Sequence, residues 1–375
     1  MVGMPEKTVP SRRIIELDLL RGFFIIVIIL DHLQFWPSPW QYITGEGRLW
    51  VSAAEGFFII SGLLIGYLRA YKGKHTPLKV LSKKLLERAG LLWLWCIIIT
   101  LIVVALSVLL PGNNSLLPKL PEAAILSSPA LFLWNVVTLN YSSDWIYFLR
   151  LYAIMLALTP IFLWLIRKKH ALLALALSLG TYLISLAFGF NEAALQWQVL
   201  FFGAAFIGWK LEEILMWLRA RPRLRVAILY SLIVFTFATM AISYFMVHGW
   251  AYVESSAPSI SRDAYISIRA NVDPVFSNNP LVPARIALSF IWFFGLLSFF
   301  HVLITLIKRY LGWLLLTFGE ASLTAYCLQA IVLVFIAKFV QLNGDFYVNG
   351  LIGIGVVLLV WLLMKIPFVR KVLPQ

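Results

Sequence analysis

The chain has 375 residues, of which 61% are hydrophobic and 13% are charged, and its mean hydropathy is +0.89. This composition lies far outside the range of soluble globular domains. A formal net charge of +14 would suggest nucleic acid as the partner of a soluble protein, but here the basic residues form short clusters between apolar runs of membrane-spanning length. We therefore exclude a nucleic-acid partner and expect a multi-pass membrane protein that contacts lipid.

The apolar runs predict an all-α fold, a polytopic bundle of about ten transmembrane helices. The whole chain, residues 1–375, is expected to form a single integral-membrane domain. In chain order, the expected helices span residues 19–36, 50–70, 90–110, 145–166, 171–188, 197–216, 226–247, 285–306, 313–340 and 348–366.

Two connecting segments are distinctive. Residues 127–140 are apolar but too short to cross the bilayer easily, so we expect a re-entrant or interfacial segment there. Residues 248–283 form a polar connection with charges of both signs, which either caps an outer cavity or only links two helices.

The distribution of basic residues predicts the topology. If the N-terminus is cytoplasmic, 23 of the 31 lysines and arginines fall on the cytoplasmic side. Cytoplasmic loops of membrane proteins carry such an excess. We therefore expect both termini to be cytoplasmic.

Four ionisable residues, Asp18, Arg21, Asp31 and His32, lie in and around the otherwise apolar first expected helix. Ionisable groups within membrane spans are usually functional. Arg21 and His32 are separated by about 16 Å at about 1.5 Å of helical rise per residue. Asp18 can pair with Arg21 on one helix face. Arg21 either anchors the helix at the cytoplasmic interface or binds the phosphates of a cytosolic cofactor through its bidentate fork.

A carboxylate in the second expected helix is the candidate partner of His32. A short outer loop makes the first two helices antiparallel neighbours, so Glu55 is expected to meet His32. A carboxylate beside an imidazole orients the ring and favours its charged form, which suits proton transfer. Asp31 points about 100° away from His32 around the helix and is the weaker orienter. The alternatives are a purely structural histidine, and a Glu55 that neutralises Arg48 or Arg21.

Further polar residues gather at the outer ends of the fourth and sixth expected helices. Tryptophan stacking and amide hydrogen bonds there would suit a sugar, although aromatic belts at the membrane interface also explain such residues. Arg150 lies inside a span and needs a carboxylate or a ligand anion. The candidate substrate-binding residues are Arg150, Tyr152, Trp197 and Gln198.

Metal and redox chemistry have little support in the sequence. Cys96 and Cys327 both fall inside predicted spans, and the chain has no CxxC or HExxH pattern. We expect no metal site and no disulfide.

Several segments resemble a known family. Arg21 and His32 within LDLLRGFFIIVIILDH resemble the signature of the membrane acyltransferase-3 superfamily. The segment SAAEGFFIISGLLIGY more specifically resembles the OpgC branch, the succinyltransferases of osmoregulated periplasmic glucans. The segments LRLYAIMLALTPIFLWLIRK, LQWQVLFFGAAFIGWKL and GEASLTAYCLQ resemble blocks that recur in that branch in the same order.

The resemblance implies an O-acyltransferase of the cytoplasmic (inner) membrane. It would move an acyl group, succinyl by analogy, from cytosolic acyl-CoA to a hydroxyl of an extracytoplasmic glucan or other glycan. His32 would be the catalytic base or an acyl relay, and Arg21 would serve the acyl-CoA. Glu55 matches the acidic position of the second-helix block, and Trp197 and Gln198 match a block that lines the cavity. Arg150 would hold a succinyl carboxylate.

One position departs from that pattern, because Gln329 stands where relatives often show histidine. The competing function is a proton-coupled transporter or flippase of a glycan or a lipid-linked substrate, with Arg21, His32 and Glu55 as a proton relay. Such transporters are expected to show inverted repeats, and none is visible in the sequence. A homo-oligomer is compatible with either function.

Overall fold

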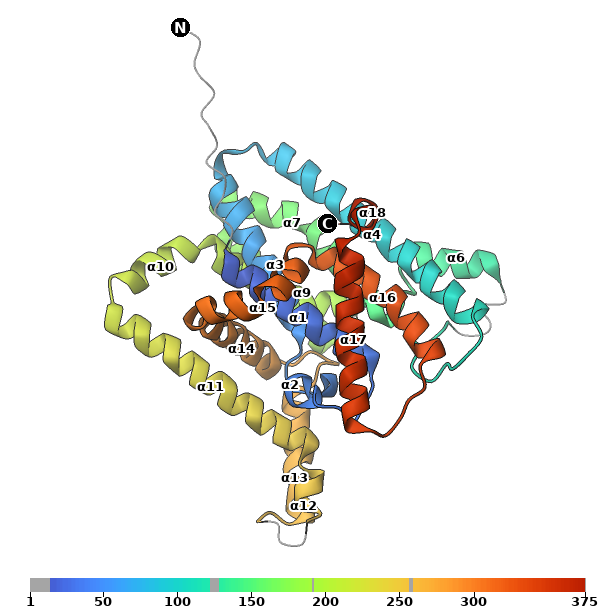
Figure 1. The fold of residues 1–375 in the computed structure, drawn as a ribbon. Coiled ribbons are helices and arrows are strands. Elements are labelled where there is room, and N and C mark those ends of the chain that lie inside the picture. The colour runs from blue at the N-terminus through green and yellow to red at the C-terminus, as the bar shows by residue number, and fades with distance from the viewer. Residues whose placement is uncertain (1–13, 122–127, 191, 256–258, 375) are drawn as a thin grey trace.

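The computed structural model describes residues 14–121, 128–190, 192–255 and 259–374. These residues form 17 α-helices, together with short 3-10 and π-helical turns and one isolated β-bridge between Asn278 and Leu281. The predicted all-α class is therefore confirmed (Figure 1).

Among the described residues, seven helical segments are long and apolar enough to cross a membrane. They correspond to seven of the ten predicted spans. The segments are Ala53–His75 (α3 with its π-helical and 3-10 continuation), Leu78–Leu109 (α4), Asp144–Arg167 (α7 with its preceding turn), Pro222–His248 (α11), Pro283–Val302 (α14), Ser322–Phe339 (α16) and Phe346–Lys365 (α17).

The other three predicted spans are also helical. The first, α1 (Ile15–Leu33), carries five acidic or basic residues, and α8 (Ala171–Ala187) and α9 (Ala193–Trp209) are shorter apolar helices. Which compartment the termini face stays a prediction. Both α18 (Pro367–Val372) and the start of α1 lie near the same end of the bundle (Figure 1).

Two predicted spans are broken in the structure. Residues 313–340 do not form a single helix: α15 (Ile304–Glu320) and α16 meet at Ala321, where φ is −124° and ψ is 45°. Residues 197–216 are divided in the same way between α9 and α10 (Leu211–Arg219) at Lys210, where ψ is 2°. Gly319, Glu320 and Ser322 flank the break at Ala321, so the apolar run is interrupted there, and the expected span 313–340 passed over that interruption.

Helix α1 lies at the centre of the bundle and packs against α3, α14, α15, α16 and α17. Its contact with α15 is unusually close, because a Cβ atom on Gly22 or Gly319 would overlap with a backbone carbonyl of the facing helix. Gly62 of α3 and Gly66 of its π-helical continuation allow the same close approach to α9. Small residues permit such backbone contact between membrane helices.

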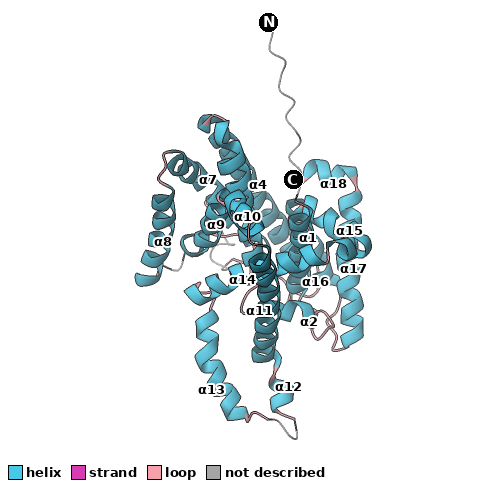
Figure 2. Cartoon of the chain, turned by 90° about the vertical axis from the view of Figure 1, so that its left-hand side faces the viewer, coloured by secondary structure: helices cyan, strands magenta, loops and turns pink. Residues whose placement is uncertain are grey.

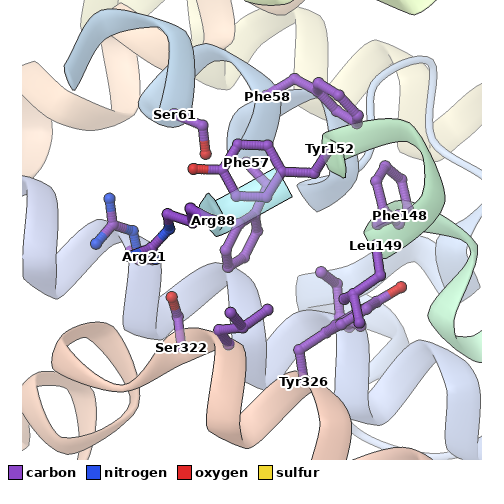
Figure 3. Close-up of a pocket in the computed structure, with 12 residues that line it drawn as sticks. Arg21, Phe57, Phe58, Ser61, Arg88, Phe148, Leu149, Tyr152, Ser322 and Tyr326 are labelled. Atoms are coloured by element: carbon purple, nitrogen blue, oxygen red, sulfur yellow. The ribbon is translucent and has the colours of Figure 1, made fainter. Parts of the chain in front are cut away.

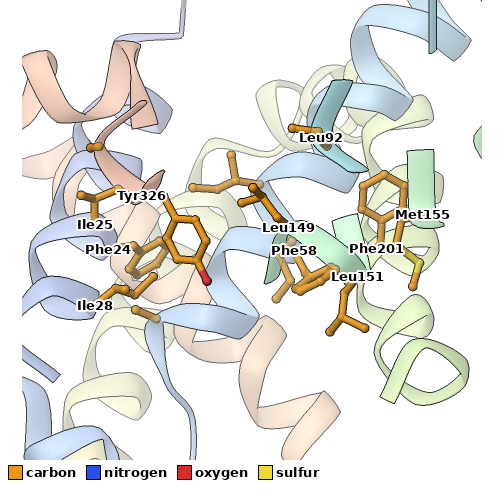
Figure 4. Close-up of a cluster of buried hydrophobic side chains, with 14 of the residues drawn as sticks. Phe24, Ile25, Ile28, Phe58, Leu92, Leu149, Leu151, Met155, Phe201 and Tyr326 are labelled. Carbon is orange, nitrogen blue, oxygen red and sulfur yellow. The ribbon is translucent and has the colours of Figure 1, made fainter. Parts of the chain in front are cut away.

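Apolar side chains from several helices meet beside α1. Ile25 and Ile28 of α1, Phe58 of α3, Leu149 of α7 and Tyr326 of α16 belong to one buried cluster (Figure 4). The four helices are thereby fixed around the segment that carries the candidate site.

The two distinctive connections are both partly helical. Residues 248–283 contain α12 (Trp250–Val253) and α13 (Arg262–Val272), which project from the end opposite the termini (Figures 1 and 2). Residue 127 lies outside the described residues; residues 128–140 contain the short helix α6 (Pro129–Val137), whose Leu131 and Trp134 are exposed. The interfacial or re-entrant placement of α6 stays a prediction. A further short helix, α2 (Gln41–Thr44), follows α1.

Candidate functional site

A pocket opens between α1, α3, α4, α7 and α16 (Figure 3). It contains about 690 Å³ of empty space, including its open mouth. Two guanidinium groups and four hydroxyl groups line it, whereas no carboxylate is among its lining residues. The lining residues are Arg21, Ile28, Phe57, Phe58, Ser61, Arg88, Phe148, Leu149, Tyr152, Ser322, Leu323 and Tyr326. This pocket, which we call the inner pocket, is suited to an anionic ligand.

The cationic end of the inner pocket is built from two helices. The Arg21 guanidinium lies 3.8 Å from Asp18 on the same face of α1, which confirms the predicted pair. Arg88 of α4 is the second cation. The expected helix 90–110 leaves Arg88 in the connection before it, but α4 begins at Leu78, so Arg88 is already within the helix. Two arginines on neighbouring helices can bind a polyphosphate together.

His32 lies about one helical turn beyond the other end of the pocket. Ile28 lines the pocket and precedes His32 by one turn of α1, and Tyr326 lines it one turn before Gln329. Gln329 and Trp145 both contact His32: the Gln329 amide is hydrogen-bonded to Nδ1, and the Trp145 ring is stacked at a centroid distance of 6.5 Å. The helical geometry thus continues the pocket wall towards the imidazole.

The Gln329 side chain determines what His32 can do. Its Nε2 donates to the carbonyl of Trp145 at 3.2 Å, and its Oε1 and Nε2 lie 3.4 Å and 3.2 Å from His32 Nδ1. An amide can serve either tautomer: Oε1 accepts from a protonated Nδ1, and Nε2 donates to a bare one. In the first tautomer, Nε2 of His32 has a free lone pair and can act as a base.

The prediction that Glu55 orients His32 is wrong in its geometry. Glu55 is fully buried and accepts hydrogen bonds from the backbone N–H and the hydroxyl of Ser52, and it forms an ion pair with Arg285 at 2.5 Å. Ser52 and Glu55 form a capping box at the start of α3. The S-x-x-E spacing that signals such a cap is present in the sequence, whereas the partner Arg285 lies 230 residues away.

Asp31 also faces away from His32, as its position on the helix predicted. Its carboxylate lies beside Gly47, close to Thr44, and both Asp31 and Thr44 line a second, mostly apolar hollow. In the described part of the chain, the side chain hydrogen-bonded to His32 is therefore neither of the two predicted carboxylates but Gln329.

The four predicted substrate-binding residues do not form one site. Tyr152 lines the inner pocket together with Arg21. Arg150 instead forms an ion pair with Glu192 at 3.3 Å, and its guanidinium lies 5.7 Å from the Tyr147 ring. The Glu192 carboxylate therefore already neutralises Arg150. The position of Arg150 inside a span no longer implies that a substrate anion binds there.

Trp197 and Gln198 have packing roles in the structure. The Trp197 ring packs against Phe58 and Phe148, which themselves line the inner pocket. Gln198 is buried and uses its amide in hydrogen bonds with the hydroxyl and the carbonyl of Ser178, which tie α9 to α8. The expectation that both residues line the cavity is therefore wrong, because Trp197 supports the wall from behind and Gln198 faces another helix.

No metal centre is visible in the described residues: they contain no group of three or more histidines, cysteines and acidic residues placed to hold an ion. Cys96 and Cys327 are both buried and free.

Comparison with known proteins identifies the family. A family model described as OpgC protein matches residues 13–370, which is nearly the whole chain. No curated protein and no solved structure matches the chain. The match covers α1 with Arg21 and His32 as well as every other helix that lines the inner pocket. The chain therefore belongs to the OpgC protein family, a family of acyltransferase type.

Proposed function

We propose that this protein is an O-acyltransferase that moves a succinyl group from cytosolic succinyl-CoA to a hydroxyl of an extracytoplasmic glucan. The observation that carries the proposal is the inner pocket, which has Arg21 and Arg88 at one end and leads towards His32 at the other. Membership of the OpgC family supports a glucan as the acceptor and succinyl as the acyl group.

The donor would lie along α1. Arg21, held by Asp18, and Arg88 would bind the phosphates of coenzyme A. The phosphate-free arm would then follow the apolar wall past Ile28 and Phe148. About 16 Å of helical rise between Arg21 and His32 would bring the thioester to the imidazole without moving the phosphates into the membrane.

The transfer requires one proton acceptor, and His32 would be that acceptor. Nε2 of His32 takes the proton of the acceptor hydroxyl while the oxygen bonds to the thioester carbonyl carbon. The carbon–sulfur bond breaks, and the departing thiolate receives the proton from the imidazolium, so the products are a succinyl ester and free coenzyme A. Gln329 Oε1 accepts a hydrogen bond from the Nδ1–H of His32 throughout. In the covalent variant, His32 first carries the acyl group and then passes it to the hydroxyl.

The test is acyl transfer in proteoliposomes, with radiolabelled succinyl-CoA on one side of the membrane and glucan on the other. His32→Ala is expected to lower ester formation and release of coenzyme A together by about 10²- to 10⁴-fold. The matched control is His170→Ala, because His170 is exposed and lies just before α8.

Two outcomes would overturn the proposal. One is transfer at the wild-type rate by His32→Ala. The other is movement of labelled glucan across the bilayer with no ester formed, which would favour a transporter.

A further inference from the structure

Helices α12 and α13 project from the opposite end of the bundle (Figures 1 and 2). A further pocket, distinct from the inner pocket and from the apolar hollow beside Asp31, lies at their base. We call it the outer pocket; it contains about 640 Å³ of empty space, including its open mouth. Its walls come from residues 48–50, the end of α11, the projecting helices with the turn after α13, and the start of α14. The residues that matter for its chemistry are Arg48, Trp50, Trp250, Arg269, Asp273 and Arg285.

Each arginine of the outer pocket already has a carboxylate partner. The Nε and Nη2 atoms of Arg269 both lie 3.1 Å from one oxygen of Asp273. Arg285 is paired with Glu55 and also donates through Nη1 to the carbonyl of Phe276 at 3.1 Å. Arg48 lies 3.6 Å from Glu46. The outer pocket therefore presents charged hydrogen-bonding groups in balanced pairs, which favours a neutral polar ligand over an anion.

Aromatic surfaces complete the pocket. The Trp50 ring stacks on Phe276 at a centroid distance of 4.2 Å, and the Trp250 ring packs edge-on against Tyr265 with Arg269 above it. The Trp50 indole N–H is buried and has no hydrogen-bond partner among the described residues. A buried donor without a partner is costly, and a ligand hydroxyl would satisfy it. Apolar surfaces with a few fixed polar groups are typical of sites that orient a small polar ligand.

The walls of the outer pocket are held in place before any ligand arrives. Tyr265 of α13 is fully buried, and its hydroxyl lies 2.9 Å from the carbonyl of Phe245 and 2.8 Å from that of Met246 at the end of α11, so that its one proton is shared between these two acceptors. The Trp50 backbone N–H donates to the Ser243 hydroxyl at 2.9 Å. Such preorganisation lowers the entropic cost of binding. Of the connection between α11 and α14, the described residues Trp250, Arg269, Asp273 and Phe276 line the outer pocket.

The outer pocket adjoins the segment that carries His32. Gly47 packs against Asp31, the residue before His32, and Arg48 follows Gly47 directly in the pocket wall. Leu49 lines both the outer pocket and the hollow that contains Asp31. These contacts place the outer pocket beside the C-terminal end of α1, on the face that carries Asp31.

We propose that the outer pocket binds the acceptor as a neutral glucose-containing oligosaccharide, with a hydroxyl bonded to the Trp50 indole N–H and others to the Arg269–Asp273 pair. This inference rests on the proposed acyl transfer. It places the acceptor at the opposite end of the bundle from the donor phosphates.

The experiment compares Trp50→Phe and Asp273→Asn with wild type, using succinyl-CoA and a panel of neutral gluco-oligosaccharides of different linkage. Trp50→Phe keeps an aromatic ring but loses the N–H, and Trp134→Phe on the exposed face of α6 is the matched control. Loss of one hydrogen bond predicts a KM for the oligosaccharide that is raised about fivefold to tenfold. The KM for succinyl-CoA should be unchanged. The His32-dependent hydrolysis of succinyl-CoA in the absence of an oligosaccharide should be unchanged as well.

An unchanged oligosaccharide KM in both variants, in an enzyme that still transfers, would overturn the outer site and leave the proposed function intact. If wild type shows no His32-dependent transfer, the proposed function fails, and calorimetric titration of the same oligosaccharides decides the site separately. Saturable binding that weakens in Trp50→Phe and not in Trp134→Phe supports it. Absence of binding, or tighter binding of a sulfated oligosaccharide than of the neutral one, overturns it.

Discussion

The inner and outer pockets both contain arginine, yet they differ in what surrounds it. The inner pocket holds Arg21 and Arg88 and has no carboxylate among its lining residues. In the outer pocket, Arg269 and Arg285 each lie about one hydrogen-bond length from an acidic partner. Arg21 does pair with Asp18, at 3.8 Å, but the two arginines of the inner pocket together exceed that one carboxylate. The first arrangement therefore attracts an anion, whereas the second offers fixed hydrogen bonds without net charge. A count of basic residues could not have distinguished them, because the difference lies in the partners.

The largest expected effect comes from breaking a pair in the outer pocket. Glu55→Gln leaves the buried guanidinium of Arg285 without a counter-charge, and removal of one partner of a buried pair costs about 3–5 kcal/mol of folding free energy. The measurement is the free energy of unfolding in detergent by denaturant titration.

The control for this loss is Glu213→Gln, which breaks an exposed pair with Lys210 and should cost less than about 1 kcal/mol. Equal losses in the two variants would show that the Glu55–Arg285 pair does not stabilise the outer pocket.

The next effect concerns the inner pocket. Arg21→Ala removes charge-assisted hydrogen bonds of about 1.5–3 kcal/mol, so the KM for succinyl-CoA should rise by about 10- to 150-fold. A truncated succinyl thioester without phosphates should show little change in KM, and Arg88→Ala should behave in the same way. A similar rise for both donors would mean that these arginines do not recognise phosphate.

A smaller effect is expected at Gln329, which we regard as a positioning residue for His32. Gln329→Ala removes one neutral hydrogen bond to the imidazole, so kcat should fall about tenfold while the KM for succinyl-CoA stays the same. Gln329→His restores a hydrogen-bonding ring and should recover part of the rate. A raised KM with an unchanged kcat would instead indicate that Gln329 only shapes the pocket.

The smallest effect sharpens the contrast without a mutation. Added salt screens exposed charges, so raising the ionic strength should increase the KM for succinyl-CoA by a few-fold. The KM for a neutral oligosaccharide should remain constant, because the arginines of the outer pocket are already paired. A parallel rise in both values would contradict the assignment of the two pockets.

The sequence predicted the parts of the site that depend on local spacing. The pair of Asp18 and Arg21 follows from their separation of three residues on one helix, and the structure confirms it. The ion pair of Glu55 with Arg285 joins residues 230 positions apart, and helix periodicity carries no information about such distant contacts. The role of Glu55 as a cap was nevertheless readable, because Ser52 precedes it by three residues.

Helix direction and helix breaks limited the rest of the prediction. The segment containing Trp197 and Gln198 was correctly placed on a helix, but its sequence did not reveal which face meets α8. The break at Ala321 falls inside the expected span 313–340, and its polar neighbours Glu320 and Ser322 were a local signal that the prediction passed over. Ser322, which lines the inner pocket directly after this break, was not predicted as a site residue.

The contact of α1 with α15 gives the helix a further property. Gly22 and Gly319 bring the two backbones together at separate points, and a side chain at either glycine would overlap with the facing carbonyl. Helix α1 is therefore held against sliding and turning relative to α15, so Arg21 and His32 keep fixed positions in the bundle. Under the proposed chemistry, the fixed distance between Arg21 and His32 selects donors by the length of the arm between their phosphates and their reactive carbon.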